Sequence, residues 1–487
     1  MTVVVNGEVD GKRLAEEGEM ELAPVQRGLL DEYLAGYLPL IGDKRTEVAF
    51  RGTVEGIISG ESLICARIAA SSPLLVTKGG HGEQRVRRMA KGKTTKHSEL
   101  GAKDLVGKLQ ARGVEQLAGQ EEVWAIVDPS ELRKPYAREM PDLMRVRRLS
   151  SEGEGTVPGY RTLNVLGVGK EGRRGILYHR LFTSQEEEFR SESWETQDAL
   201  ESVGRALQSK VGRVTYICDS QFDDIAVWGA IWEQGNHVVC RLKHQERVVE
   251  RPIGPDPGGT QLWLRVSVAE AKGCARELAR VRTDLLVRKG GQSYRKRQPV
   301  TAKIAATPIR VSYQVDTRTR FGGAMGEKRV WLVVVTLENV GWEPWVLLTD
   351  WSVEDEESAI QVFRMYRQRW AVEDCFKFTK GVLGWEEVQL LDFEGVRTLV
   401  ALGWVAAGFL YELGVTLEWS EVRLLARLGG WVERQDRPPG KTIITRGLQR
   451  LLNHWATEAV LLDEIARYGQ LPPRLAELIG WPPNGRP

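Results

Sequence analysis

The chain has 487 residues, of which 42% are hydrophobic, a length and composition typical of about two to four domains with substantial cores. The formal net charge of +2 excludes recognition of nucleic acid by overall charge alone. Five cysteines without paired spacing argue against zinc fingers and against a disulfide framework. The N-terminus lacks the pattern of a signal peptide, and the longest apolar stretch, 399–411, is shorter than a bilayer requires. We therefore expect a soluble, intracellular protein in which residues 399–411 form a buried helix.

The N-terminal region, residues 1–118, has a mostly helical pattern and a local excess of positive charge. Between residues 78 and 97 there are seven cations and one acid, Glu83. Such a patch suits a phosphate backbone, and a solvated basic loop is the alternative. We expect DNA contacts from these side chains: Arg85, Arg87, Arg88, Lys91, Lys93 and Lys96.

Two short apolar runs, each rich in strand-forming residues, are followed directly by an aspartate. Residues 123–127 precede Asp128, and we expect Pro129 to end that strand. Residues 214–218 precede Asp219 in the same way. A buried strand that ends in aspartate places a carboxylate at a sheet edge, where ligands bind in α/β folds. The alternative is that each aspartate opens a turn or caps a helix.

Further elements of an α/β domain are predicted around these aspartates. Residues 167–172 match Gly-x-Gly-x-x-Gly, but a strand pattern follows instead of a helix, so we reject a dinucleotide site in favour of a hairpin. In chain order, the patterns predict strands at 160–168 and 175–182, a helix at 193–210, a second helix ending at Glu233, and strands at 237–242, 261–268, 305–315 and 329–337.

The most specific pattern in the chain consists of Tyr366, Arg369, Glu373 and Lys380. On one helix, beginning near Ser352 with a capping-box-like start, these four side chains would fall within an arc of roughly 60°. One carboxylate would then share a narrow face with two cations and a phenol, an arrangement suited to binding phosphate beside a metal ion. The alternative is ordinary ion pairing, because Arg369 and Glu373 have the i, i+4 spacing of helical salt bridges.

This Tyr-x2-Arg-x3-Glu-x6-Lys spacing resembles the Tyr-Arg-Glu-Lys signature of DDE transposases from bacterial insertion sequences. The resemblance implies an α/β fold with an RNase H-like catalytic core, interrupted by a β-rich insertion domain and flanked by helical N- and C-terminal regions. It also implies that Asp128, Asp219 and Glu373 are the catalytic, metal-binding acids. DNA-phosphate contacts are implied for Tyr366, Arg369, Lys377 and Lys380.

Trp345 stands just before a Leu-Leu-Thr strand pattern at residues 347–349. In transposases similar to this chain, a tryptophan at this place stacks on a base flipped out of the DNA end and helps a hairpin intermediate to form and resolve. The resemblance gives this role to Trp345, with Trp331 and Trp342 as the other candidates. The alternative is a packing role, because the chain has 16 tryptophans and most must be buried.

The spacing of the acids predicts the domain organisation. Asp219 and Glu373 are 373 − 219 = 154 positions apart, more than a compact RNase H-like domain needs, so we expect an insertion between them. The expected parts are a helical DNA-binding region at 1–118, the first part of the catalytic core at 119–245, a β-rich insertion at 246–343, the second part of the core with the signature helix at 344–415, and a helical C-terminal region, a candidate for dimerisation, at 416–487.

The implied activity is cut-and-paste DNA transposition. Three carboxylates would hold two Mg²⁺ ions, with Mn²⁺ as a substitute, which stabilise charge on the attacking and leaving oxygens of a phosphodiester. Cleavage at the element's ends would be followed by transfer of the 3′-hydroxyls into target DNA. The expected partners are double-stranded DNA, at terminal inverted repeats and at the target, and a second copy of the chain in a homodimer. The expected location is the cytoplasm, at the nucleoid, without a membrane.

Two other functions remain open at this stage. The first is a domesticated DNA-binding protein that derives from a transposase and lacks catalysis. The second is a metal-dependent nuclease without strand transfer.

Overall fold

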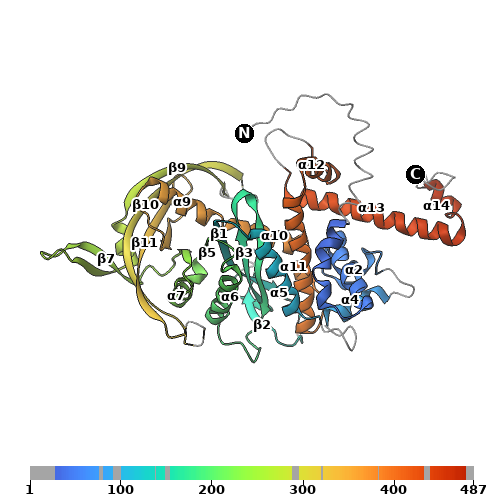
Figure 1. The fold of residues 1–487 in the computed structure, drawn as a ribbon, viewed down its shortest axis with the longest axis horizontal. Helices are drawn as coiled ribbons and strands as arrows, with labels where there is room; N and C mark the ends of the chain where they lie inside the picture. Colours follow the sequence, from blue (N-terminus) through green and yellow to red (C-terminus); the bar gives the residue numbers. More distant parts are fainter. Residues whose placement is uncertain are drawn as a thin grey trace, which may run out of the picture. The chain divides into compact units, whose positions relative to one another are not determined.

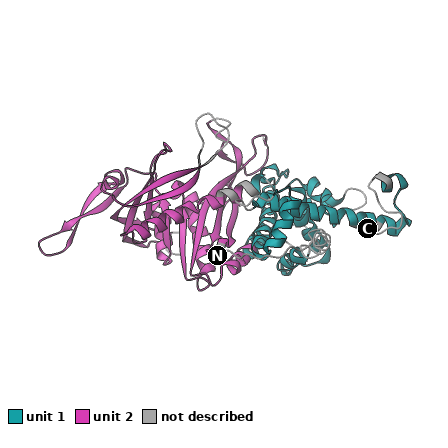
Figure 2. Cartoon of the chain, turned by 90° about the horizontal axis from the view of Figure 1, so that it is seen from above, with its two compact units in different colours: residues 1–108, 377–487 teal, residues 109–376 magenta. Residues whose placement is uncertain are grey.

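The computed structural model describes residues 28–75, 81–91, 100–137, 139–148, 154–287, 296–317, 319, 322–381, 383–432 and 439–478. Within these ranges, the side chains of residues 171, 286, 287, 296, 297, 373, 374, 377, 378, 459, 463, 477 and 478 are not described. The chain divides into two compact units (Figure 2). We call residues 109–376 the sheet unit, and residues 1–108 together with 377–487 the helical unit.

One twelve-stranded mixed sheet forms the centre of the sheet unit (Figure 1). Its strands are β1 (Glu122–Arg133), β2 (Met144–Arg147), β3 (Thr156–Val168), β4 (Arg174–Phe182), β5 (Arg213–Cys218), β6 (His237–Arg241), β7 (Val248–Pro255), β8 (Gln261–Ser267), β9 (Arg276–Val287), β10 (Lys296–Gln314), β11 (Met325–Leu337) and β12 (Trp345–Thr349). The order is β2-β3-β1-β5-β6-β12-β11-β10-β7-β8, with β4 paired to β3 and β9 paired to β10. Only the β1–β5 and β5–β6 pairs in this described sheet are parallel. The expected α/β class is confirmed.

Two helices, α6 (Glu192–Leu207) and α7 (Ile225–Glu233), bury their apolar sides against one face of the sheet (Figure 1). Each begins where a polar side chain caps its first turn. The Ser191 hydroxyl accepts a hydrogen bond from the backbone N–H of Trp194, and the Asp224 carboxylate accepts one from Ala226. The alternating residues of β1, such as Val127, join the same core, so the next residue along the strand points to the opposite face.

Residues 246–343 add strands to this sheet and contain one short helix, α8 (Val268–Gly273). β12 connects the two parts of the sheet, because it pairs with β6 on one side and with β11 on the other. The expected strands at 261–268, 305–315 and 329–337 correspond to β8, β10 and β11. Their boundaries differ most in β10, which begins nine residues earlier than expected.

In the described part of the helical unit, all of the regular secondary structure is helical. They are η1 (Leu38–Leu40), α2 (Lys44–Gly60), α3 (Cys65–Ala70), α4 (His81–Ala90), η5 (Trp385–Glu387), α11 (Phe393–Thr416), α12 (Trp419–Leu428), α13 (Lys441–Tyr468) and α14 (Pro473–Leu478), together with an unlabelled helical segment near residue 30. α5 (Ala102–Leu117) and α10 (Trp370–Gly381) each contribute residues to both units. α11 packs against α2 and α4, and α13 packs against α12 and α2.

α11 is the one described helix that is long and apolar enough to cross a membrane by length and composition. Its 24 residues extend beyond the apolar stretch 399–411 at both ends. Of its most apolar window, 78% is buried inside the protein, as in the core helix of a globular unit. The expected burial of residues 399–411 is therefore confirmed.

The expectation that Pro129 ends the first strand is wrong. β1 continues to Arg133, and Pro129 lies opposite Leu163 of β3. The parallel ladder with β5 ends at Val127, so β1 has a partner on only one side beyond that residue. Proline has no backbone N–H to donate. The strand tolerates it here because the edge of β1 that faced β5 is unpaired at this position and requires no hydrogen-bond donor.

The expectation of one signature helix beginning near Ser352 is also wrong. α9 (Glu356–Arg367) begins at the N-cap Asp355, which forms a capping box with Ser358, and α10 begins only at Trp370. Between the two helices, Gln368 and Arg369 form a tight turn whose backbone N–H groups bond three residues back, to Met365 and Tyr366. The four signature residues therefore lie on two helices and the turn that joins them.

Candidate active site

Asp128 and Asp219 come together where the neighbouring strands β1 and β5 stop pairing. β1 and β5 are parallel neighbours, and their last paired residues are Val127 and Cys218. Asp128 is the next residue of β1, and Asp219 follows directly after the end of β5. Burial raises the pKa of the Cys218 thiol well above its usual range, and the negative charges of Asp219 and Asp128 raise it further, which places both carboxylates near this one thiol. The convergence expected for these two acids is therefore what the strand register produces.

A buried polar row continues from Asp128 across the sheet. Asn164 of β3 lies directly opposite Asp128, and His179 of β4 lies directly opposite Asn164. The Asn164 carbonyl oxygen is 2.7 Å from His179 Nδ1, and its amide donates to Thr162 Oγ1 at 2.9 Å. Directly opposite residues of antiparallel strands point to the same face, so this network supports the strand segment that carries Asp128. The sequence reasoning missed Asn164 and His179, whose signal was a polar residue within each apolar strand run.

Asp219 caps the short helix η4 (Ser220–Phe222), and its Oδ1 accepts a hydrogen bond from the backbone N–H of Gln221 at 2.8 Å. Burial raises the pKa of the Asp219 carboxyl, while that hydrogen bond and the charges of Arg369, Arg241 and Arg147 lower it. Asp219 is thus a partly desolvated carboxylate in a cationic surrounding. This is a site in which a bound cation would relieve the cost of burying the negative charge.

Tyr366 and Arg369 of the signature lie beside the two aspartates. Arg369 Nη1 is 3.9 Å from Asp128 Oδ1. Burial raises the pKa of Tyr366 to about 12, opposed by the charges of Arg369 and Arg241. At neutral pH the phenol therefore keeps its proton. The turn between α9 and α10 places the guanidinium over the aspartates, although the helix is not continuous.

The remaining signature residues lie on α10. The backbone of Glu373 is in its first turns, four residues after Arg369, while the side chains of Glu373 and Lys377 lie outside the described residues. Lys380 Nζ is 3.4 Å from Glu386 Oε1. Among the described side chains, no group of three or more His, Cys, Asp or Glu residues forms a metal site. The third acid and the phosphate contacts of Lys377 and Lys380 therefore stay predictions.

Trp345 is a packed side chain in this structure. Only 5% of it is exposed, and its ring centroid is 5.4 Å from Tyr366, 6.0 Å from Trp370 and 6.2 Å from Phe363. A flipped base could stack on this ring only after these neighbours move, so its proposed role stays a prediction. Of the other two candidates, Trp342 is 37% exposed and Trp331 lies within β11.

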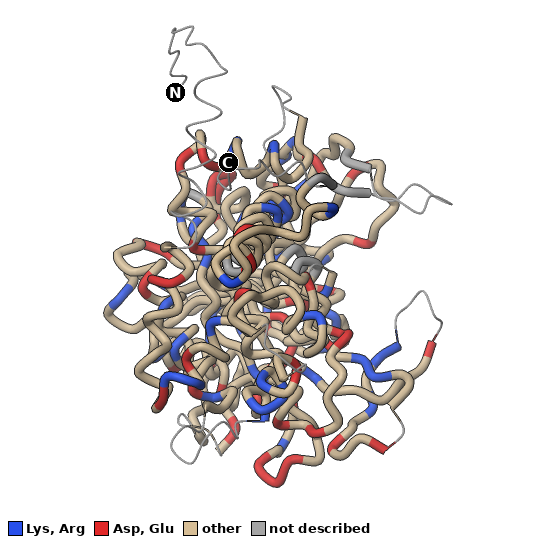
Figure 3. The backbone as a smooth tube through the Cα atoms, turned by 90° about the vertical axis from the view of Figure 1, so that its right-hand side faces the viewer, with Lys and Arg blue, Asp and Glu red and all other residues tan. Residues whose placement is uncertain are grey.

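The expected DNA-contacting cations of the N-terminal region lie partly on α4, which carries Arg85, Arg87 and Arg88. Arg87 pairs with Glu83 one turn earlier, with the nearest atoms 2.7 Å apart. Lys91 Nζ is 3.5 Å from Asp392 Oδ2, and Lys93 and Lys96 lie outside the described residues. Basic and acidic residues are interspersed along the described backbone (Figure 3), in agreement with the near-neutral net charge.

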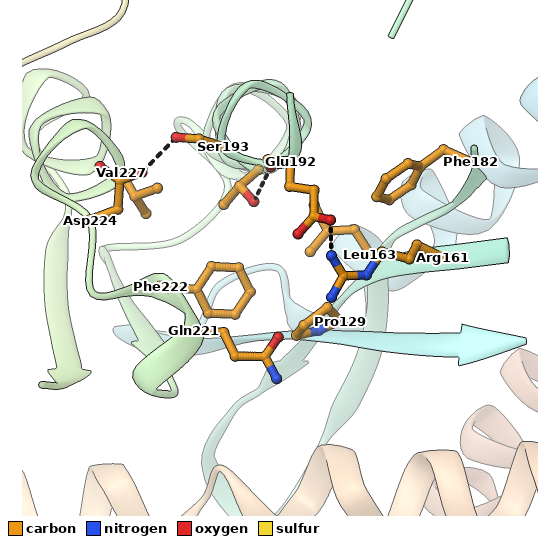
Figure 4. A pocket seen from close by; sticks show the side chains of 11 residues that line it. Pro129, Arg161, Leu163, Phe182, Glu192, Ser193, Gln221, Phe222, Asp224 and Val227 are labelled. Carbon is orange, nitrogen blue, oxygen red and sulfur yellow. Dashed lines mark hydrogen bonds and ion pairs between the residues drawn. The ribbon is translucent and has the colours of Figure 1, made fainter. Parts of the chain in front are cut away.

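A small pocket of about 100 Å³ lies on the sheet face that α6 and α7 cover (Figure 4). Phe222, Leu163 and Val227 give it an apolar wall. The Arg161 guanidinium, paired with Glu192, and the Gln221 side chain line its polar part. Neither Asp128 nor Asp219 lines this pocket, because their side chains belong to the other face of the sheet.

Comparison with known families identifies part of the chain. Residues 195–407 match the family model of the transposase DDE domain, a segment that contains Asp219 and the whole signature but not Asp128. No curated protein matches the chain. The matched segment covers less than half of the chain, and it is similar to the DDE domain of transposases.

Proposed function

We propose that this protein is a DNA transposase that cuts phosphodiester bonds at the ends of a mobile element and joins the freed 3′-hydroxyls to target DNA. The observation that carries the proposal is the pair of aspartates, Asp128 and Asp219, on adjacent positions of two parallel strands with Arg369 beside them. Similarity of residues 195–407 to the transposase DDE domain supports the same assignment.

The donor set suits hard divalent cations such as Mg²⁺ or Mn²⁺. Asp128 and Asp219 supply carboxylate oxygens, which these ions prefer. Glu373, on the first turns of α10, is the residue we assign as the third ligand. When bound, a pair of such ions supplies the positive charge that stabilises the attacking and leaving oxygens of a phosphodiester.

The other residues of the site position DNA. Arg369 carries a planar guanidinium that can hold two oxygens of one phosphate, a geometry that lysine cannot reproduce. Tyr366 keeps its proton because its pKa is raised to about 12, so its hydroxyl can donate a hydrogen bond to a phosphate oxygen. Asn164 and His179 hold the strand that carries Asp128, which limits the movement of this carboxylate during the reaction.

The test uses labelled DNA duplexes that contain the ends of the mobile element, taken from the DNA that flanks the reading frame; we call each such end a border. The duplexes are incubated with the full chain and with Mg²⁺, Mn²⁺ or EDTA. We expect metal-dependent cleavage at the border, and loss of cleavage by ~10³-fold or more in Asp128→Asn, Asp219→Asn and Glu373→Gln, with border binding retained in a gel-shift assay. Cleavage that persists in Asp219→Asn would remove this residue from the site.

A second assay separates transposition from simple nuclease action. A pre-cut border with a free 3′-hydroxyl is mixed with supercoiled target DNA and the protein. Transposition predicts covalent joining of the border to the target, whereas a nuclease would cut the border without joining it. Border binding without either reaction would favour a DNA-binding role instead.

A further inference from the structure

Asp223 is a buried carboxylate near the site with several hydrogen bonds. It lies four residues after Asp219, and its side chain is fully buried. Its carboxylate bonds to residues that lead into residues 246–343, which we call the strand-rich segment. Its Oδ2 accepts hydrogen bonds from the backbone N–H groups of Lys243 at 2.7 Å and His244 at 2.8 Å. Its Oδ1 accepts one from Arg247 Nη2 at 2.6 Å. The carboxylate therefore fixes residues 243–247 to the loop that follows Asp219.

Arg247 completes this connection on the backbone side. Its Nη2 also donates to the carbonyl oxygen of Asp223 at 2.9 Å, so one guanidinium holds both the main chain and the side chain of this residue. The guanidinium lies over the ring of Trp228, 4.9 Å from its centroid. The Trp228 indole N–H in turn donates to the carbonyl oxygen of Phe222 at 3.1 Å. The loop is thus held from two sides.

We propose that Asp223 and Arg247 are positioning residues that fix the Asp219 carboxylate for metal binding. This inference rests on the proposed function, because it assigns a purpose to the loop that presents Asp219. The loop between Asp219 and α7 is only five residues long, so a shift of Asp223 must move its neighbours. Groups that hold a metal ligand in place typically change metal affinity by about 10–100-fold when they are removed.

The connection also joins the second acid to the strand-rich segment. Residues 243–247 lead directly into β7, the first strand of residues 246–343. If the strand-rich segment shifted, residues 243–247 would therefore shift Asp223, and Asp223 would in turn shift Asp219.

An ordinary buried ion pair would stabilise the fold without affecting the site, and the chain offers a matched control of that kind. Arg180 and Glu195 form an ion pair with the nearest atoms 2.6 Å apart, and the Glu195 side chain is 1% exposed. This pair links β4 to α6 on the sheet face opposite the aspartates. Asp223→Asn and Arg247→Met are therefore compared with Glu195→Gln in the full-length protein.

Hydrogen exchange measured by mass spectrometry tests positioning without any metal or DNA. The amides of Gln221, Phe222 and Asp224 are hydrogen-bonded within the loop. We expect these amides to exchange on the order of 10-fold faster in Asp223→Asn and Arg247→Met, and at the wild-type rate in Glu195→Gln. Wild-type exchange in both Asp223→Asn and Arg247→Met would overturn the proposal.

Calorimetric titration with Mn²⁺ alone gives the second readout. We expect Kd to rise by about 10-fold or more in Asp223→Asn, and to stay within about 2-fold of wild type in Glu195→Gln. An equal rise in both variants would show a general effect of stability and would overturn the positioning role. Mn²⁺ binding that survives in Asp219→Asn would instead refute the metal site of the proposed function, and the exchange result would still decide whether Asp223 holds the loop.

Discussion

Replacing Trp345 by alanine tests how much the packing of this ring contributes to stability. The ring is 5% exposed and has three aromatic neighbours, with centroids 5.4–6.2 Å away. Truncating a buried tryptophan to alanine costs about 3–5 kcal/mol, to which each aromatic pair contributes about 0.5–1.5 kcal/mol. With a urea m-value of about 3 kcal/mol per molar, the unfolding midpoint should fall by about 1–2 M.

The assay follows urea unfolding of the full chain by tryptophan fluorescence and circular dichroism. Trp342→Ala is the matched control, because Trp342 lies in the same unit and is 37% exposed, so its midpoint should change little. Trp345→Phe should recover part of the loss, because a smaller ring still fills most of the space. A loss below about 1 kcal/mol in Trp345→Ala would refute the packing argument.

Three further predictions concern the site. Asn164→Leu should destabilise the protein by about 1–3 kcal/mol, because it removes the buried hydrogen bonds that Asn164 makes with His179 and Thr162; an unchanged urea midpoint would contradict this. Arg369→Lys keeps the charge but loses the planar fork, so we expect cleavage to fall about 10-fold with little change in border binding; wild-type cleavage would exclude a role in phosphate recognition. Because burial raises the pKa of Asp219 in the folded protein, its proton is held more tightly there than in the unfolded chain, so the metal-free protein loses stability as pH rises through that pKa. Asp219→Asn should therefore be more stable than wild type at neutral pH without metal, and the gain should vanish below about pH 3.9; equal stability of the two proteins at pH 7 would contradict the shift.

The sequence predicted the strands that carry the two aspartates because local patterns determine them. An apolar run of strand-forming residues before Asp128, and another before Asp219, indicated both strands. The closeness of the two residues was implied by the family resemblance, and the parallel register of β1 with β5 shows how it arises. Local patterns gave the wrong end for β1, because that end depends on the neighbouring strands. Pro129 lies within β1, at a position where β5 has already ended.

Features that depend on pairing between distant residues could not be predicted. Asn164 and His179 become part of the site only because two antiparallel ladders align them with Asp128. Arg247 and Asp223 are 24 positions apart, and no local pattern indicates that one guanidinium bonds both the main chain and the carboxylate of the other. The turn after α9 was missed for a different reason, since a helical spacing of side chains is compatible with a short irregularity in the backbone.

The way β12 joins the two parts of the sheet limits how this protein could be shortened or recombined. A variant that deletes residues 246–343 would strip β11 from β12 and leave a wholly buried five-residue strand with one unpaired edge. Unpaired apolar edges invite association with other chains, so such a truncation should aggregate even though it keeps every proposed catalytic residue. A designer who wishes to exchange this part of the chain must keep β11 or supply another strand in its register.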